Sequence, residues 1–487
     1  MRSLVLAMLL AVADSLATPV LAATIERIDI KGAHALVTVP DDWNGSLFLY
    51  AHGYTSDGRI VGPIPENIAD AVPVLWPGML PFVPAGYATA ISTFRSAGWD
   101  VKDAIKDVEN LRRWFTKKHG RPKYTYIWGH SGGGMITEAL IEYFPRTYDG
   151  ASPQCGTGGG GRRLWHAAYD LRVMYEWTCR DVPGAHMACG LCTDGASRCI
   201  DDVDCPAGQT CAGTEAPFPP EDGLTAECTA LILDHPERFG DIGGGGSLVD
   251  RAIASCLGGD TPTFEQAARR DLLVRASQLP ANQLESDLFF ATVALGEIVH
   301  RRTDGKHPWG NIGVVYASPL LTAAEQAALD AGVHRSDADA SAVRYMRRFY
   351  EPRGQTHTKV ITVHALDDGL VIPEHETKYR QAFEASGRTG QLLQVFTATG
   401  AHCTNVRPYM PALEALTDWV ERGVTPTTAS VNAACGNCLT TVSPGPFAAK
   451  SPERRQKGAP LRTIVCTGAP GDCPAGATCD VAKRRCK

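Results

Sequence analysis

One serine lies in a pattern that can make its hydroxyl group a nucleophile. Ser131 is the middle residue of Gly129-His130-Ser131-Gly132-Gly133, which fits Gly-x-Ser-x-Gly. The apolar stretch 124–128 before it predicts a strand, and the stretch 135–143 after it predicts a helix. A tight turn from strand to helix exposes the serine on a strained backbone, and the glycines leave room around it. The pattern therefore predicts nucleophilic catalysis. A phosphate-binding loop is less well supported, because the closing Lys followed by Ser or Thr is missing.

Such a serine needs a base, and the base needs an acid, each at the end of a strand. Asp367 and Asp368 follow the apolar stretch that begins at Val360, and on this placement either carboxylate can be the acid. His402 follows the next apolar stretch, 393–396, and it is the only one of the 14 histidines placed in this way. The order serine, aspartate, histidine predicts a catalytic triad in which His402 is the base.

The elements that must position these residues alternate between strands and helices. Five continuous apolar runs predict strands that are covered on both faces. Apolar residues at helical spacing predict a helix over 104–118, and a closing helix is expected over 409–421. This alternation predicts an α/β fold with a mostly parallel sheet wrapped by helices. The buried runs are 47–51, 87–93, 124–128, 360–363 and 393–396, and edge strands are expected at 25–31 and 34–40.

A different pattern occupies residues 156–355, between the serine and the acid. After a cysteine-rich stretch it contains a series of helical patterns, so it predicts a mainly helical lid or cap inserted into the sheet domain. Glycine-rich stretches at 158–161 and 243–246 are candidate hinges. The core is then expected over 23–155 and 356–425. The predicted lid helices are 265–279, 284–300, 323–332 and 340–350.

Together, the serine turn, the aspartate loop, His402 and the His52-Gly53 pair after the first buried run resemble an α/β-hydrolase. The acid loop of that superfamily resembles His364-x-x-x-Asp368-x-x-Val371-x-Pro373, and this likeness favours Asp368 over Asp367 as the acid. The resemblance also implies two backbone N–H groups that polarise a carbonyl, from Gly132 and from Tyr54. No cofactor is implied.

Secreted carboxylic-ester hydrolases with a large lid, such as tannases and feruloyl esterases, are similar in layout. They often pair a cysteine beside the serine with one beside the histidine. Here Cys403 follows His402, but His130 precedes Ser131. Cys155, Cys179 or Cys256 is therefore the expected partner of Cys403, and Cys155 is favoured because it ends the strand after the serine's helix. A free buried thiol is the alternative.

The remaining cysteines form two modules that share the pattern Cys-Pro-Ala-Gly-x-Thr-Cys. One lies within the lid at 189–228, and the other lies within a C-terminal module, 426–487. Disulfides are expected to replace a core in such short segments, although six cysteines permit 15 pairings. Zinc at the Cys-x-x-Cys pairs is the alternative. Calcium at an acidic cluster is less well supported than a solvated loop. The modules contain Cys189, Cys192, Cys199, Cys205, Cys211, Cys228 and Cys435, Cys438, Cys466, Cys473, Cys479, Cys486, and the acidic cluster is Asp194, Asp201, Asp202 and Asp204.

Residues 1–22 have the features of a secretory signal peptide. Arg2 precedes a short apolar run, and small residues end at Ala22. The 16 cysteines agree with export to the medium, periplasm or cell surface, since disulfides persist there. The apolar run is too short to span a bilayer, and no later segment is long enough. A net charge of -6 gives no support for nucleic-acid binding.

These patterns predict a secreted serine esterase that acts on a small or polymer-derived ester. A serine peptidase on the same fold is the main alternative, because Gly-x-Ser-x-Gly-Gly also resembles the serine turn of prolyl oligopeptidases. A binding protein that uses its cysteine modules is the third, and an intact triad argues against it.

Overall fold

The computed structural model describes residues 23–54, 86–186, 189–213, 225–233 and 247–445, together with two short strands near the C-terminus. The predicted signal peptide and most of the second cysteine module lie outside these residues. The C-terminal strands, β12 (Cys479–Asp480) and β13 (Arg485–Cys486), pair antiparallel.

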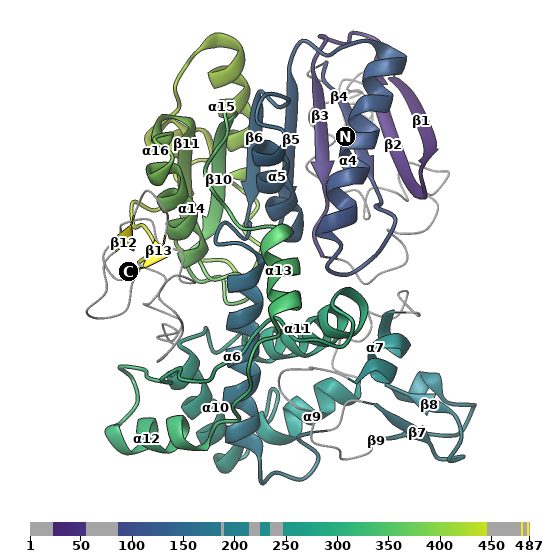
Figure 1. The fold of residues 1–487 in the computed structure, drawn as a ribbon, viewed down its shortest axis with the longest axis vertical. Coiled ribbons are helices and arrows are strands. Elements are labelled where there is room, and N and C mark those ends of the chain that lie inside the picture. Colours follow the sequence, from purple (N-terminus) through teal and green to yellow (C-terminus); the bar gives the residue numbers. More distant parts are fainter. Residues whose placement is uncertain are drawn as a thin grey trace, which may run out of the picture.

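Eight strands form one twisted sheet in the order β1-β2-β4-β3-β5-β6-β10-β11 (Figure 1). β2 runs antiparallel to both of its neighbours, and the other pairs are parallel. The predicted α/β class and mostly parallel sheet are therefore confirmed. The strands are β1 (Ala23–Ile30), β2 (Ala33–Pro40), β3 (Leu47–Ala51), β4 (Ala88–Ser92), β5 (Thr125–His130), β6 (Gly150–Gln154), β10 (Lys359–Ala365) and β11 (Leu392–Thr397).

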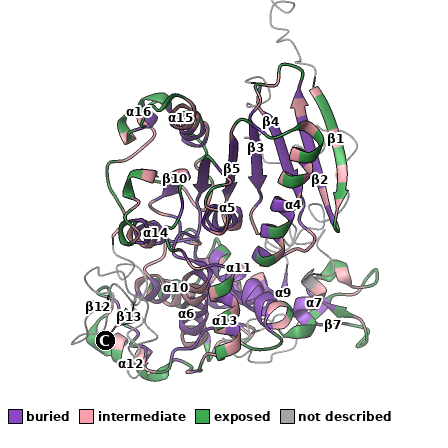
Figure 2. Ribbon diagram, turned by 45° about the horizontal axis from the view of Figure 1, so that its top comes forward, coloured by how far each residue is buried: buried purple, intermediate pink, exposed green. Residues whose placement is uncertain are grey.

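Helices cover both faces of this sheet because the central strands are apolar on both sides. All five residues of β3 are buried, and alternate residues enter two different cores. Leu47 and Leu49 pack with α4 and α5, whereas Phe48 and Tyr50 pack with α15. Figure 2 shows the contrast between the buried central strands and the partly exposed edge strand β1. The helices are α4 (Val101–His119), α5 (Gly132–Tyr143), α14 (Glu374–Ala385), α15 (Tyr409–Arg422) and α16 (Thr428–Ala434).

The chain between β6 and β10 is mainly helical, and it lies beyond one end of the sheet, in the lower half of Figure 1. The four helices expected there are present within a few residues of the predicted bounds. Two further long helices, α6 and α9, were not predicted. The helices are α6 (Gly161–Cys179), α7 (Ala226–Leu233), α9 (Leu248–Leu257), α10 (Phe264–Ser277), α11 (Leu284–Glu297), α12 (Ala323–Gly332) and α13 (Ala340–Arg348). A π-helical turn, η5 (Ile298–Arg302), extends α11.

The first cysteine module folds as predicted, with three disulfides among its six cysteines. They brace a small sheet made of β7 (Gly190–Cys192), β8 (Arg198–Cys199) and β9 (Cys211–Gly213). The carboxylates of the acidic cluster accept bonds from nearby backbone N–H groups; Asp194, for example, accepts from Ala196 and Ser197. The disulfides of the described residues are Cys155–Cys403, Cys179–Cys256, Cys189–Cys228, Cys192–Cys205, Cys199–Cys211 and Cys435–Cys438.

Both Cys-x-x-Cys pairs thus give their sulfurs to disulfides. Cys189 and Cys192 each bond to a different partner, and Cys435 bonds to Cys438. Among the described helices, none is long and apolar enough to cross a membrane.

Candidate active site

Ser131 lies at the sharp turn between β5 and α5. Its φ of 56° and ψ of −124° put a non-glycine residue in a strained region of backbone space. The turn is possible because Gly129 and Gly133 have no side chain. A Cβ at Gly133 would lie 2.0 Å from the Ala51 carbonyl oxygen, and one at Gly129 would lie 2.5 Å from the same atom. The turn therefore holds the serine hydroxyl at the end of the sheet.

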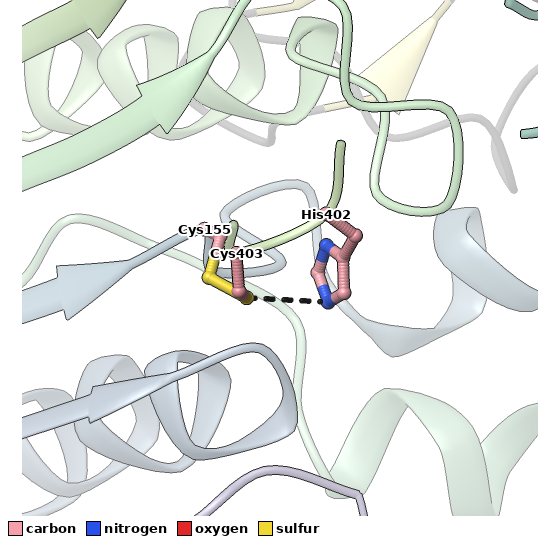
Figure 3. A group of neighbouring side chains, drawn as sticks. All are labelled: Cys155, His402 and Cys403. Carbon is pink, nitrogen blue, oxygen red and sulfur yellow. Dashed lines mark hydrogen bonds between the residues drawn. A yellow bond between two sulfur atoms is a disulfide. The ribbon is translucent and has the colours of Figure 1, made fainter. Parts of the chain in front are cut away.

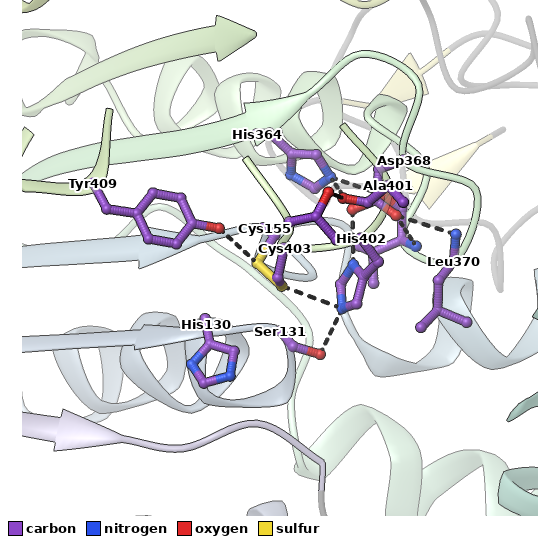
Figure 4. The surroundings of a disulfide bond; sticks show 12 residues. His130, Ser131, Cys155, His364, Asp368, Leu370, Ala401, His402, Cys403 and Tyr409 are labelled. Atoms are coloured by element: carbon purple, nitrogen blue, oxygen red, sulfur yellow. Dashed lines mark hydrogen bonds and ion pairs between the residues drawn. A yellow bond between two sulfur atoms is a disulfide. The ribbon is translucent and has the colours of Figure 1, made fainter. Parts of the chain in front are cut away.

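The structure brings the three predicted side chains into one hydrogen-bonded chain. Nε2 of His402 lies 2.8 Å from Oγ of Ser131, and Nδ1 lies 2.7 Å from Oδ2 of Asp368 (Figure 4). Asp368, rather than Asp367, hydrogen-bonds the histidine. This geometry lets His402 accept the serine proton while the carboxylate fixes the tautomer and orientation of the ring.

Asp368 is fully buried, and its second oxygen is also held. Oδ1 accepts hydrogen bonds from the backbone N–H groups of Leu370 and Val371, at 3.1 and 3.0 Å. Burial alone would raise the pKa of this carboxyl group, but the charges and hydrogen bonds of His402 and His364 outweigh it and lower the pKa. The group is thus ionised wherever the protein is folded near neutral pH.

A second histidine, His364, contacts the same oxygen of Asp368 that His402 hydrogen-bonds. Nε2 of His364 lies 3.3 Å from Oδ2 of Asp368, and Nδ1 lies 3.4 Å from Oε1 of the buried Glu376. Although burial disfavours the imidazolium ion, the two carboxylates raise the pKa of His364 to about 10. In the sequence, His364 stands out only as the first residue of the motif that favours Asp368 as the acid. Its spacing of four residues before Asp368 was the available signal.

The two backbone segments that carry the expected N–H groups lie close together. Gly132 is the first residue of α5, so its N–H has no carbonyl within the helix to bond. A Cβ at Gly132 would lie only 3.1 Å from the backbone nitrogen of Tyr54, which shows how closely the two segments approach.

His52 stacks on Phe94, with ring centroids 3.9 Å apart, and burial lowers the pKa of His52 to about 4. A neutral packing role for His52 fits this environment.

Solved structures with a similar arrangement include hydrolases of several kinds. Feruloyl esterase B from Aspergillus oryzae is 13% identical, with 83% of this chain and 80% of that chain covered at a TM-score of 0.39. The rice cell wall degrading esterase LipA from Xanthomonas oryzae is 11% identical, with 80% of this chain and 85% of that chain covered at a TM-score of 0.36. Acylaminoacyl peptidase from Pyrococcus horikoshii is 9% identical, with 85% of this chain and 43% of that chain covered at a TM-score of 0.38.

The chain spans less than half of that peptidase, and it covers only 22% of a prolyl endopeptidase that also matches. No protein-family model and no curated protein matches the sequence. The strand order, the antiparallel second strand and the serine turn between β5 and α5 decide the fold. The chain has the α/β-hydrolase fold.

Within this fold, a disulfide holds the loop that carries His402. Cys155, at the end of β6, bonds to Cys403, as predicted (Figure 3). Sγ of Cys403 lies 3.4 Å from Nε2 of His402, and the hydroxyl group of Tyr409 donates to Sγ of Cys155 at 3.3 Å. The disulfide therefore ties His402 to the central sheet.

His130 occupies the position beside the serine. Its Nδ1 lies 2.6 Å from the hydroxyl oxygen of Tyr50 on the neighbouring strand β3. Burial, together with the nearby His402 and His52, lowers the pKa of His130 to about 3. His130 is therefore neutral and joins two adjacent strands beneath the serine turn.

The helical insertion contacts the acid loop directly. Gln283, just before α11, donates from Nε2 to the carbonyl oxygen of Asp367 at 2.7 Å. Its Oε1 accepts from the N–H of Gly369 at 2.9 Å. One side chain of the insertion thus hydrogen-bonds the residue before Asp368 and the residue after it. The sequence did not predict this contact.

Proposed function

We propose that this protein is an exported serine hydrolase that cleaves carboxylic esters through an acyl-enzyme on Ser131. The observation that carries the proposal is the continuous chain of hydrogen bonds from Ser131 through His402 to the buried Asp368. A hydroxyl group that is bonded to an imidazole, itself oriented by a carboxylate, is the arrangement that nucleophilic acyl transfer requires.

In the first half of the proposed reaction, Oγ of Ser131 attacks the ester carbonyl carbon and gives its proton to Nε2 of His402. The imidazolium ion is stabilised by Asp368. The tetrahedral intermediate then collapses, and His402 returns the proton to the oxygen of the leaving alcohol. In the second half, His402 takes a proton from water as the water attacks the acyl-enzyme. The acid leaves, and the proton returns to Ser131.

The backbone N–H groups of Tyr54 and Gly132 are the proposed donors to the oxyanion. Both lie on the side of the serine turn where Gly132 meets the Tyr54 backbone. Fixed dipoles of this kind stabilise the negative charge without reorganising during the reaction. The start of α5 adds a favourable partial positive charge.

Residues 156–355 are the proposed lid, because they follow β6, return at β10 and contact the acid loop through Gln283. Export is proposed from the N-terminal sequence pattern and is supported by the disulfides, which an oxidising compartment maintains.

The test is a panel of short-acyl, long-acyl and aromatic nitrophenyl esters beside aminoacyl anilides, assayed with the wild type and with Ser131→Ala. We expect ester hydrolysis that Ser131→Ala abolishes. Cleavage of anilides without cleavage of esters would establish the peptidase alternative instead. No turnover of any substrate would favour the binding-protein alternative.

A further inference from the structure

A small pocket lies beside the acid loop, between the sheet domain and the helical insertion. Its walls come from α6, from the end of α10, from α11 and from residues 369–375, and most of the side chains are apolar. No lysine or arginine is among these lining residues. The cavity of about 40 Å³ has room for roughly three water-sized groups. It therefore suits a short chain better than a long one.

The pocket adjoins both parts of the proposed catalytic apparatus. Gly369 and Leu370 line it, and they directly follow Asp368. Figure 4 shows Leu370, whose backbone N–H donates to Asp368, the residue that hydrogen-bonds His402. Two other lining residues, Trp165 and Phe290, pack their rings against the side chain of Tyr54, with centroids 6.3 and 5.0 Å away. A group bound in the pocket would lie next to a substrate that reaches Ser131.

One carboxyl group in the pocket lacks a partner. Asp287 of α11 is 4% exposed, and its Oδ2 makes no hydrogen bond with any described residue. This atom lies against Gly369, where a Cβ would come within 2.4 Å of it. Burial and the nearby charge of Asp368 raise the pKa of Asp287 well above its usual value. By contrast, the other aspartate of the pocket, Asp170, accepts a hydrogen bond from Tyr316 at 2.7 Å.

A buried carboxyl group without a partner costs stability, so its position in an apolar wall calls for a ligand that supplies the missing hydrogen bond. A hydroxyl group can donate to the carboxyl group, and an amino group can donate and also pair with its ionised form. A ligand carboxylate is disfavoured, because the ionised Asp368 lies next to the pocket and no lining residue is a lysine or arginine that would pair with a second negative charge.

We propose that this pocket binds a short apolar part of the ester substrate that ends in a hydroxyl or amino group, and that Asp287 accepts its hydrogen bond. The inference rests on the proposed function in taking the ligand to be an ester. It adds the substrate class and assigns a specificity residue outside the triad.

The experiment measures binding apart from turnover. Ser131→Ala is titrated calorimetrically with three nitrophenyl esters of nearly equal shape, the 3-hydroxybutanoate, 3-aminobutanoate and 3-methylbutanoate. A second set places the same three end groups on the alcohol part of acetate esters. The titrations are repeated with Asp287→Ala, Asp287→Asn and the control Asp271→Asn, each combined with Ser131→Ala. Asp271 lies on α10 of the same insertion, with 63% of its side chain exposed.

In at least one set, the hydroxyl and amino esters should bind about tenfold more tightly than the methyl ester. Asp287→Ala should remove both preferences. Asp287→Asn should keep the preference for hydroxyl, because its amide oxygen still accepts, and lose the preference for amino. Asp271→Asn should change neither. Thermal melting of each variant checks that it is folded.

The proposal is overturned if, in both sets, the methyl ester binds as tightly as the hydroxyl and amino esters. It is also overturned if folded Asp287→Ala still binds the hydroxyl and amino esters more tightly than the methyl ester. Failure of the proposed function has a different signature. In that case the wild type hydrolyses none of these esters, while Ser131→Ala still binds them with the preference that Asp287 provides.

Discussion

His364 and His402 approach the same atom, Oδ2 of Asp368, at 3.3 and 2.7 Å. One histidine faces the serine, and the other is enclosed between two carboxylates with no exposed surface. Because the raised pKa of His364 keeps its ring positively charged, Asp368 contacts a buried positive charge in addition to His402. His364 and His402 therefore compete for the negative charge of the same carboxylate.

Replacing His364 with Gln should move the pH profile of hydrolysis. Loss of the positive charge removes a competitor for Asp368, so the carboxylate stabilises the imidazolium form of His402 more strongly. The acid limb of kcat/KM should shift upward by roughly one pH unit, and the measurement is kcat/KM from pH 4 to 9. His357→Gln is the control, because His357 is exposed and remote from the triad. An unchanged acid limb in a folded His364→Gln would contradict the prediction.

The same histidine should make stability depend on pH in the alkaline range. The pKa of His364 is raised from 6.5 to about 10 in the folded state, so its contribution to stability is complete below about pH 6.5. It is lost as the pH rises through 10. The urea midpoint of the wild type should therefore fall between pH 7 and pH 10, and His364→Gln should flatten this fall. Parallel curves for the two proteins would argue against a charged His364.

Short-range signals predict the sheet, and they also single out Ser131, Asp368 and His402, which the structure joins by hydrogen bonds. Apolar runs mark the buried strands, and the glycines around Ser131 mark the one turn that admits no side chain at 129 or 133. The favoured pairing of Cys155 with Cys403 rested on the resemblance, which draws attention to the cysteine after His402, and on the place of Cys155 at a strand end; the structure confirms it.

The contacts that the sequence could not predict join segments that are far apart in the chain. Gln283 reaches the acid loop across 86 residues, and nothing in its own neighbourhood marks it as different from other glutamines. Likewise, α6 carries buried residues nearly all round, so it lacks the one-sided stripe by which an amphipathic helix is recognised. Such features depend on how the insertion packs on the sheet domain.

Gln283 should affect turnover without contacting the substrate. Gln283→Leu removes both hydrogen bonds that flank Asp368, so we expect kcat to fall about tenfold, as for one lost transition-state contact of about 1.4 kcal/mol, with KM little changed. Gln283→Glu can still accept from the Gly369 N–H but cannot donate to the Asp367 carbonyl oxygen. Its kcat should therefore lie between those of the wild type and Gln283→Leu. Steady-state kinetics checks this order. Equal kcat values for all three proteins would show that the insertion does not position the acid.

A side chain at Gly133 should disrupt the fold, whereas a side chain at Gly390 should not. Gly133→Ala would press a methyl group onto the Ala51 and His52 carbonyl oxygens, at 2.0 and 2.5 Å, and α5 or β3 would have to move. We expect a loss of several kcal/mol in the free energy of unfolding, or no folded protein. Gly390→Ala is the matched control, because a Cβ there meets nothing within 4 Å. Similar melting temperatures for both variants would contradict the tight packing of the serine turn.

The disulfide beside His402 should be needed for turnover more than for folding. Cys403 carries a positive φ of 57° and directly follows the histidine, so release of its sulfur frees the loop to move the ring away from Ser131. Mild reduction should slow ester hydrolysis by the wild type. It should have little further effect on Cys155→Ala/Cys403→Ala, which already lacks the bond and should show a low kcat with a nearly normal far-UV spectrum. Mass spectrometry of the alkylated protein identifies which disulfide opens first. Equal proportional losses in both proteins would assign the effect of reduction to the other disulfides and would remove Cys155–Cys403 from the account of how His402 is held.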